Sequence, residues 1–132
     1  MAKKEFTYRG KTVDELKQMD IQQFMKLVPS RERRKLKRGY TDAEKILLKK
    51  IDAAISGTWK KPIKTHCRDM IILPKLIGLK IHIHNGKEFI MIDVVPDMVG
   101  HRLGEFANTT IYVKHNAPGI GATRSSAFQS VK

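Results

Sequence analysis

Residues 77–95 read IGLKIHIHNGKEFIMIDVV, and this stretch predicts a β-hairpin as the central element of the fold. Its two arms are rich in isoleucine and valine, the β-branched residues that favour strands. Asn85-Gly86 stands between the arms, and both residues tolerate the positive φ that a type I′ hairpin turn requires. The sequence therefore predicts two antiparallel strands joined at this dipeptide.

The two arms differ in the faces that they offer to a core. Ile81 and Ile83 alternate with His82 and His84, which is typical of a strand with one buried face. Residues 89–92 are apolar at every position, so we expect at least part of this arm to be covered on both faces. A further short strand is predicted at Thr110–Lys114.

Helices are predicted before residue 58, and their ends carry recognisable signals. Helix starts are expected at Thr12, Asp20, Ser30 and Thr41, of which the first, second and fourth have Glu or Gln three residues later, as in a capping box. Pro29, Gly39 and Gly57 are expected to end the last three helices. The last helix should bury a stripe of Ala43, Ile46, Leu47, Ile51, Ala54 and Ile55. These elements predict an α/β (α+β) fold with packed helices and a small, mainly antiparallel sheet.

The chain has 132 residues, which suits one ordinary domain with two flanking segments. Residues 1–61 hold 17 basic and 8 acidic side chains, whereas residues 62–98 hold 5 and 4. We therefore expect a basic helical N-terminal extension at 1–40, an α/β core at 41–115 and a flexible C-terminal tail at 116–132. The tail has little capacity to form a core, so it should be extended and become ordered only on a partner.

The charge of the chain narrows the classes of partner. Lys and Arg number 26 against 13 acidic residues, which gives a net charge of +13. Such a chain is expected to bind a polyanion, and nucleic acid is the best candidate. The longest apolar run, residues 70–73, is far shorter than the ~20 residues of a membrane span, so we expect no membrane partner. The charged N-terminus has no apolar stretch after it, which predicts a cytoplasmic protein without a secretory signal.

Two basic stretches are candidates for contact with nucleic acid. The first comprises Arg31, Arg33, Arg34, Lys35, Lys37 and Arg38, and the second comprises Lys60, Lys61, Lys64, His66 and Arg68. A run of cations is often only a solvated face, but the repulsion within it is relieved when a polyanion neutralises the charges. Tyr40 and Trp59 beside these stretches could stack on bases, although core packing is the usual role of such rings.

Residues 98–106 read MVGHRLGEF, a segment that fits neither a helix nor a strand. Gly100 and Gly104 permit positive φ and a close approach of the backbone to a partner. His101 and Arg102 offer donors that suit phosphate oxygens. The segment is therefore interpreted as a contact loop, and the alternative is a tight corner with solvated charges.

The sequence offers little for catalysis or metal binding. It has no nucleophile elbow, phosphate-cradling glycine loop or catalytic pair of carboxylates. His82 and His84 could bind a metal from one strand face, but no third ligand is apparent, and Cys67 is the single cysteine. We therefore predict a protein that is not an enzyme and that has neither a metal nor another cofactor.

Several motifs carry a resemblance to a known family. Residues 85–87 (NGK), residues 98–106 and Thr109 are similar to the signature of the small-subunit ribosomal protein family S-nineteen. Residues 61–65, followed by Arg68, Pro74 and Ile77-Gly78, fit the core pattern of that family. The basic run at 31–39 and the segment at 118–123 resemble the extensions of its archaeal and eukaryotic branch.

This resemblance implies a structural constituent of the small ribosomal subunit that binds rRNA of the 3′ domain in the subunit head and has no activity of its own. It also implies neighbouring head proteins of families thirteen and fourteen, and a tail that reaches toward the decoding region and its tRNAs. RNA-binding positions are then expected in both basic stretches and at Lys87, Gly100, His101, Arg102, Lys114, His115 and Arg124. From the residues alone, a DNA-binding or chromatin module and an enzyme that acts on RNA stay open as alternatives.

Overall fold

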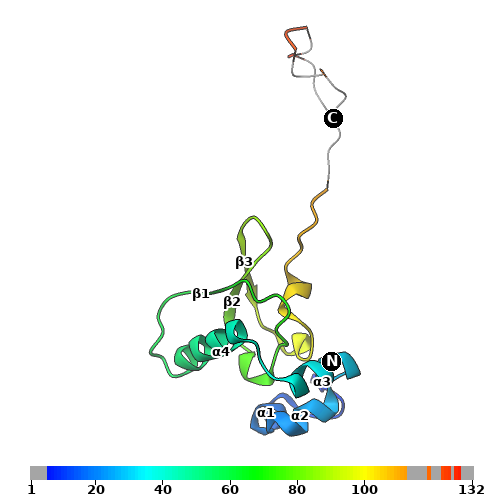
Figure 1. The fold of residues 1–132 in the computed structure, drawn as a ribbon, viewed down its shortest axis with the longest axis vertical. Coiled ribbons are helices and arrows are strands. Elements are labelled where there is room, and N and C mark those ends of the chain that lie inside the picture. The colour runs from blue at the N-terminus through cyan, green and yellow to red at the C-terminus, as the bar shows by residue number, and fades with distance from the viewer. Residues whose placement is uncertain (1–5, 113–118, 120–122, 126, 129–132) are drawn as a thin grey trace, which may run out of the picture.

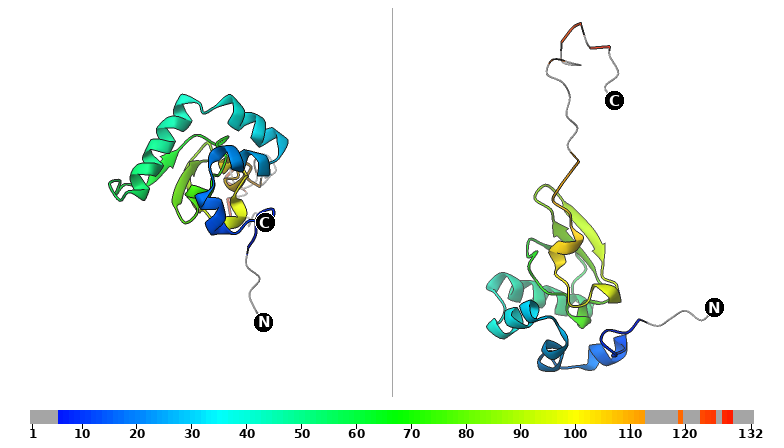
Figure 2. Two further views of the ribbon diagram at one scale, coloured as in Figure 1. Left: turned by 90° about the horizontal axis from the view of Figure 1, so that it is seen from below. Right: turned by 90° about the vertical axis from the view of Figure 1, so that its right-hand side faces the viewer.

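A computed structural model describes residues 6–112, 119, 123–125 and 127–128. Within them, four α-helices precede a three-stranded sheet, which confirms the α+β fold (Figure 1). The helices are α1 (Val13–Gln18), α2 (Ile21–Leu27), α3 (Ser30–Arg38) and α4 (Asp42–Ile55), and the strands are β1 (Ile63–Thr65), β2 (Lys80–His84) and β3 (Phe89–Asp93). Short 3-10 helices lie at η1 (Pro74–Leu76), η2 (Pro96–Met98) and η3 (Leu103–Phe106). Helices α1–α3 lie at one end of the molecule, and the hairpin points toward the other (Figure 2).

The sheet has the order β1-β2-β3, with β2 in the middle. The antiparallel pairing of β2 with β3 confirms the predicted hairpin. The short strand β1 was not predicted, and it pairs in parallel with β2. Ile63, Ile81 and Ile92 face one another across the three strands, and all three belong to the core.

The hairpin turn differs from the predicted type. Gly86 has a φ of 103°, but Asn85 is not among the residues with positive φ, so the turn is not type I′. The loop instead spans residues 85–88, and the side-chain oxygen of Asn85 accepts hydrogen bonds from the backbone N–H groups of Lys87 (2.9 Å) and Glu88 (2.8 Å). Asparagine thus closes the loop through its side chain, as in an Asx turn.

We expected at least part of β3 to be covered on both faces, and the middle of the strand does not have this cover. Ile92 is buried, but Met91 is 54% exposed. On that outer face Phe89 has ring neighbours, namely His66 and His84, whose centroids lie 5.2 and 4.8 Å from its own. The apolar run at 89–92 therefore did not mark a second layer over Met91.

Two of the predicted capping boxes form. Thr12 and Thr41 each accept a hydrogen bond from the N–H group of the glutamate three residues later, and each glutamate accepts from the backbone of its threonine. Asp20 precedes α2 without a side-chain hydrogen bond, so the capping box predicted at Asp20 does not form. Pro29, not Ser30, occupies the cap of α3, because the Pro29 carbonyl accepts the first helical bond, from Arg33.

Helix α4 is rotated from the orientation that the apolar stripe predicted. Glu44, Leu47 and Ile51 are its buried residues, whereas Ile46 and Ile55 are 56% and 55% exposed. Ala43 is also exposed, and Ala54 is half-buried. The predicted stripe did not include Glu44, a charged residue that has a partner inside the protein. Because Glu44 is buried, the face of α4 that carries Ile46 and Ile55 is turned toward the surface.

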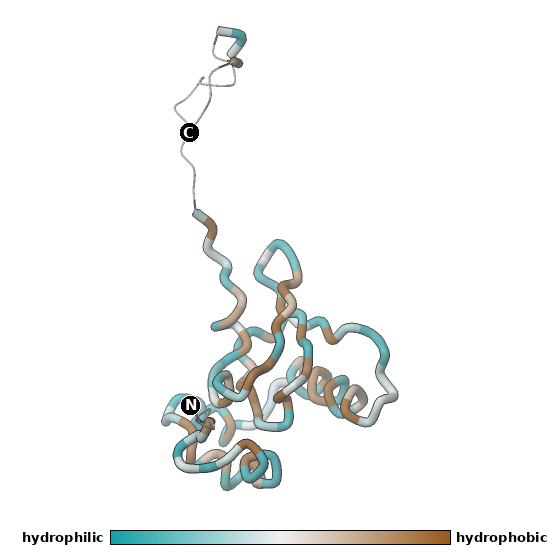
Figure 3. Tube along the Cα trace, turned by 180° about the vertical axis from the view of Figure 1, so that it is seen from behind, coloured by the Kyte–Doolittle hydropathy of each residue, from teal (hydrophilic) through white to brown (hydrophobic). Residues whose placement is uncertain are grey.

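The core unites the helices, the sheet and the segments around residues 70–76 and 94–107. Apolar residues concentrate along the strands and in α4 (Figure 3). The predicted strand at 110–114 is wrong for residues 110–112, which form no strand, and Tyr112 is fully exposed. Residues 113 and 114 lie outside the described residues.

Candidate nucleic-acid interface

The loop at residues 98–106 is held firmly against the segment at 68–72. Four backbone hydrogen bonds of 2.7–3.0 Å join them, including Ile72 N–H to His101 O and Gly104 N–H to Arg68 O. Val99 and Leu103, which belong to the loop, have buried side chains. Hydrogen bonds and buried side chains thus attach the loop to the rest of the fold.

The two glycines shape this loop. Gly100 has a φ of 84°, and a Cβ atom there would lie 2.6 Å from the Tyr8 hydroxyl oxygen. A Cβ atom at Gly104 would lie 2.9 Å from the carbonyl oxygen of Arg68. Both positions therefore need glycine for reasons inside the protein, and their backbone presents His101 and Arg102.

A carboxylate lies beside each of the two polar side chains, His101 and Arg102, that the loop presents. His101 Nδ1 lies 2.7 Å from Glu105 Oε2, and Arg102 Nε lies 3.5 Å from Glu32 Oε1. Partial burial opposes the charge of Glu105, but hydrogen bonds from the Arg102 backbone and from His101 outweigh it and lower the pKa of Glu105. His101 is exposed, whereas Arg102 is half-buried and faces α3.

The first basic stretch forms α3, and its members have two different roles. Arg33 points toward α2, where its Nε donates to Met25 O (3.0 Å) and its Nη2 donates to Val28 O (3.1 Å) and Lys26 O (3.3 Å). These carbonyls lie at the end of α2, where backbone acceptors lack helical partners. Arg33 is therefore bound internally.

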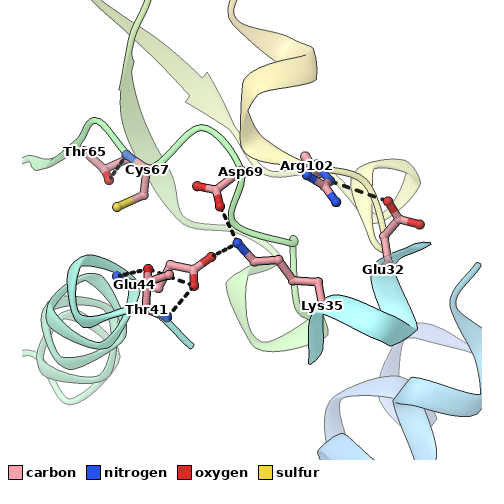
Figure 4. A network of polar contacts seen from close by, with 8 residues as sticks. All are labelled: Glu32, Lys35, Thr41, Glu44, Thr65, Cys67, Asp69 and Arg102. Carbon is pink, nitrogen blue, oxygen red and sulfur yellow. Dashed lines mark hydrogen bonds and ion pairs between the residues drawn. The ribbon is translucent and has the colours of Figure 1, made fainter. Parts of the chain in front are cut away.

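Lys35 also points inward, between two carboxylates (Figure 4). Its Nζ lies 2.8 Å from Oε1 of the buried Glu44 and forms an ion pair with Asp69. Burial opposes the charge of Lys35, but the two carboxylates outweigh it and raise the pKa of Lys35 above its usual value. The hydrogen bond from Lys35 lowers the pKa of Asp69. This network ties α3 to α4 and to the segment before β2.

Three arginines of α3 line a hollow together with Lys35. The hollow has a volume of about 530 Å³ and is lined by Arg31, Arg34, Lys35, Arg38, Gly39, Tyr40, Thr41 and Arg102. Within the described part of the chain, no carboxylate pairs with Arg31, Arg34 or Arg38. Helical spacing explains the gathering, because residues 31, 34 and 38 fall on one face of a helix. Lys37 is exposed outside this lining.

The second basic stretch lies on a different part of the surface. Lys60 and Lys61 border a hollow of about 410 Å³ that also includes Met91 on the outer sheet face. Lys64 places its Nζ 5.3 Å from the Phe89 ring centroid, and the His66 and His84 rings lie 4.4 Å apart. The structure thus separates the two stretches, with α3 on one surface and these residues beside the sheet.

Arg68 has an internal role that its sequence position did not indicate. Its guanidinium donates to the carbonyl oxygens of His84 (2.8 Å), Gly104 (2.8 Å) and Ala107 (2.6 Å). Arg68 thereby joins the hairpin end to the loop at 98–106.

The remaining predicted RNA-binding positions are Lys87, Lys114, His115 and Arg124. Lys87 is exposed in the hairpin loop, and Arg124 is exposed in a turn. Lys114 and His115 lie outside the described residues. Contact of any of these positions with RNA stays a prediction.

Three carboxylates of this region, Glu32, Glu44 and Asp69, were not predicted as site residues. The capping-box spacing after Thr41 located Glu44, but nothing local indicated its second bond to Lys35. Asp69 and Glu32 gave no signal, because their partners are distant in sequence. Among the described residues, no three metal-ligating side chains gather, and no helix there is long and apolar enough to cross a membrane.

Comparison with known proteins matches most of this region to one family. The family model described as ribosomal protein S19 matches residues 34–115, which include Arg34, Arg38 and the loop at 98–106. The chain belongs to the ribosomal protein S19 family. The curated small ribosomal subunit protein uS19 of Saccharolobus solfataricus is 53% identical over 130 residues, which cover 98% of this chain and 93% of that relative. The resemblance noted in the sequence is thereby confirmed, and the similarity to a member of this family from an archaeon extends across both flanks.

Proposed function

We propose that this protein is a structural constituent of the small ribosomal subunit, where it binds rRNA and supports decoding during translation in the cytoplasm. Its membership of a ribosomal protein family supports this structural role, and we propose no enzymatic function. The observation that carries rRNA binding is the row of three arginines on α3 that no described carboxylate neutralises. Such a surface suits the phosphate backbone of RNA.

The sorting of cations defines which residues should contact RNA. Arg33, Lys35 and Arg68 are bound to groups of the protein itself, so we assign them to the fold. The proposed contact residues are those left outside: Arg31, Arg34, Lys37, Arg38, Lys60, Lys61, Lys64 and Lys87, with His66, His101 and Arg102 at the borders. Lys114, His115 and Arg124 are proposed with the tail.

The finer placement rests on the family alone. We propose that the RNA partner is the 3′ domain of the small-subunit rRNA in the head, with head proteins of families thirteen and fourteen as neighbours. We also propose that residues 116–132 form a tail that approaches tRNA, beyond an extension at 1–40 and a core at 41–115. No feature of the described structure favours duplex DNA over RNA.

The salt dependence of rRNA binding tests the proposal. If about eight phosphates are neutralised, log affinity should fall against log salt with a slope of roughly −6 to −7. Arg34→Gln combined with Arg38→Gln should make the slope shallower by about 1.4–1.8, because each lost phosphate contact contributes about 0.7–0.9. The matched control is Lys45→Gln combined with Lys75→Gln, since both lysines already pair with Asp42 or Asp52. A nearly flat slope for the natural protein would contradict the proposed rRNA binding. Binding to duplex DNA as tight as binding to rRNA in a competition experiment would also contradict it.

A further inference from the structure

We propose that the hollow beside α3 is a discrete phosphate-binding site, not merely a stretch of basic surface. Its volume of about 530 Å³ falls within the range of about 300–1,000 Å³ that is usual for ligand sites. It can therefore hold a phosphate group together with part of the chain to which that group is attached. The proposal relies on the proposed function only for the identity of that chain, which would be rRNA.

The charges around the hollow are unbalanced on the side that faces a ligand. Glu44 and Asp69 pair with Lys35, and Glu32 pairs with Arg102. These three carboxylates therefore neutralise Lys35 and Arg102. The three arginines of α3 on the same lining have no carboxylate of their own among the described residues. Their mutual repulsion opposes the compact arrangement, and an anion in the hollow would remove it.

Two donors in residues of this lining make no hydrogen bond. The Tyr40 hydroxyl is buried without a hydrogen-bond partner, and Arg102 Nε, which lies 3.5 Å from Glu32 Oε1 as an ion pair, makes no hydrogen bond within the described structure. Buried donors are seldom left in this state, and a ligand is one of the usual reasons. Both residues line the hollow, where a bound anion would offer acceptor oxygens. The half-buried Tyr40 has its pKa raised by burial and by the nearby Glu44 carboxylate, so its hydroxyl keeps its proton.

The chemistry of the lining favours phosphate over a carboxylate ligand. The guanidinium group presents paired N–H donors that match phosphate oxygens, and four of the lining residues are arginines. The lining offers only one aromatic ring, that of Tyr40, to an apolar side chain of a peptide. An acidic peptide is therefore the disfavoured occupant and an outcome that the test must detect.

The site is complete only when α3 is docked on the core. Arg31, Arg34 and Arg38 come from α3, whereas Arg102 comes from the loop that hydrogen bonds hold against residues 68–72. A ligand that binds this assembled site must stabilise the docked arrangement by mass action. The phosphate site therefore couples RNA binding to the attachment of the N-terminal helices.

The test uses the full-length protein and pyrophosphate, which supplies two joined phosphate groups without a base or sugar. Calorimetric titration should show one saturable site, and thermal unfolding should shift upward with pyrophosphate more than with chloride of equal ionic strength. Arg34→Gln with Arg38→Gln should weaken pyrophosphate binding at least about tenfold, since charge-assisted hydrogen bonds are the strong ones. Tyr40→Phe should weaken it about threefold or more, as expected for loss of one hydrogen bond.

Lys37→Gln is the matched control, because Lys37 is exposed on the same helix but does not line the hollow. It should leave pyrophosphate affinity within about twofold, as expected of a charge outside the site. Equal loss with Lys37→Gln, no saturable binding, or equally tight binding of a glutamate-rich peptide would overturn the proposal. If the protein binds rRNA with the expected salt slope but not pyrophosphate, the phosphate site is wrong and the ribosomal function stands. If the protein binds pyrophosphate but not rRNA, the phosphate site stands and the proposed ribosomal function is wrong.

Discussion

Replacement of Arg33 by alanine should destabilise the fold, whereas replacement of its neighbour Arg34 should not. Arg33→Ala removes three hydrogen bonds to carbonyls of Met25, Lys26 and Val28, of which two are partly buried. Hydrogen bonds from charged groups contribute about 1.5–3 kcal/mol each, but freed carbonyls near the surface can bind water. We therefore expect a loss of about 2–3 kcal/mol in the free energy of unfolding, or roughly 6–12 °C in Tm for a chain of this size.

Urea unfolding followed by circular dichroism measures this loss directly. Arg34→Ala should change the free energy of unfolding by at most about 0.5 kcal/mol, because its side chain has no described partner in the protein. In rRNA binding the order should reverse, with Arg34→Ala weakening affinity in the folded protein. The reasoning is refuted if Arg33→Ala unfolds at the same urea concentration as the natural protein, or if both substitutions destabilise equally.

Further substitutions at Gly100, Arg68 and Asp69 test other parts of the structure. Gly100→Ala should cost about 2 kcal/mol or more, because alanine would be strained at positive φ and would collide with Tyr8; Tyr8→Phe should relieve part of this loss in a double-mutant cycle of urea unfolding. Arg68→Ala should lower the free energy of unfolding by about 3 kcal/mol, because it removes three hydrogen bonds inside the protein. It should leave the rate of association with RNA unchanged, and a stopped-flow measurement at several salt concentrations tests this. The lowered pKa of Asp69 contributes stability above the pKa of the unfolded chain, and this is lost as pH falls through the lowered value. Asp69→Asn should flatten the acid limb of stability against pH, and an unchanged limb would contradict the role of the Lys35 pair.

Local features of the fold could be predicted because their causes lie close together in the sequence. The capping boxes at Thr12 and Thr41 depend on residues three positions apart, and both form. The hairpin follows from alternation in β2 and a short connection to β3. In contrast, β1 has only three residues and pairs with a strand that begins fifteen positions after it ends, so nothing local marked it. Its parallel register depends on the packing of the whole core.

The candidate site was predictable in composition but not in arrangement. The sequence showed six basic residues between positions 31 and 38, and the helix that carries them. It could not show which face of α3 meets the core, because that rotation is set by contacts with α2 and with Asp69, a residue distant in sequence. From the sequence, Arg33 and Lys35 could not be distinguished from Arg34, although both bind groups inside the protein. The rotation of α4 was missed for the same reason, since Glu44 is buried only with its partner Lys35.

Crosslinking from α3 inside assembled subunits tests the central claim most directly. A photoreactive group placed at Lys37, which is exposed beside the arginine row and has no described partner, should crosslink to rRNA of the 3′ domain in purified small subunits. The same group at Arg33, which points toward α2, should give no rRNA crosslink if the protein still assembles. Sequencing of the crosslinked RNA identifies the nucleotides. Subunits that contain the protein but show no rRNA crosslink at position 37 would contradict the account.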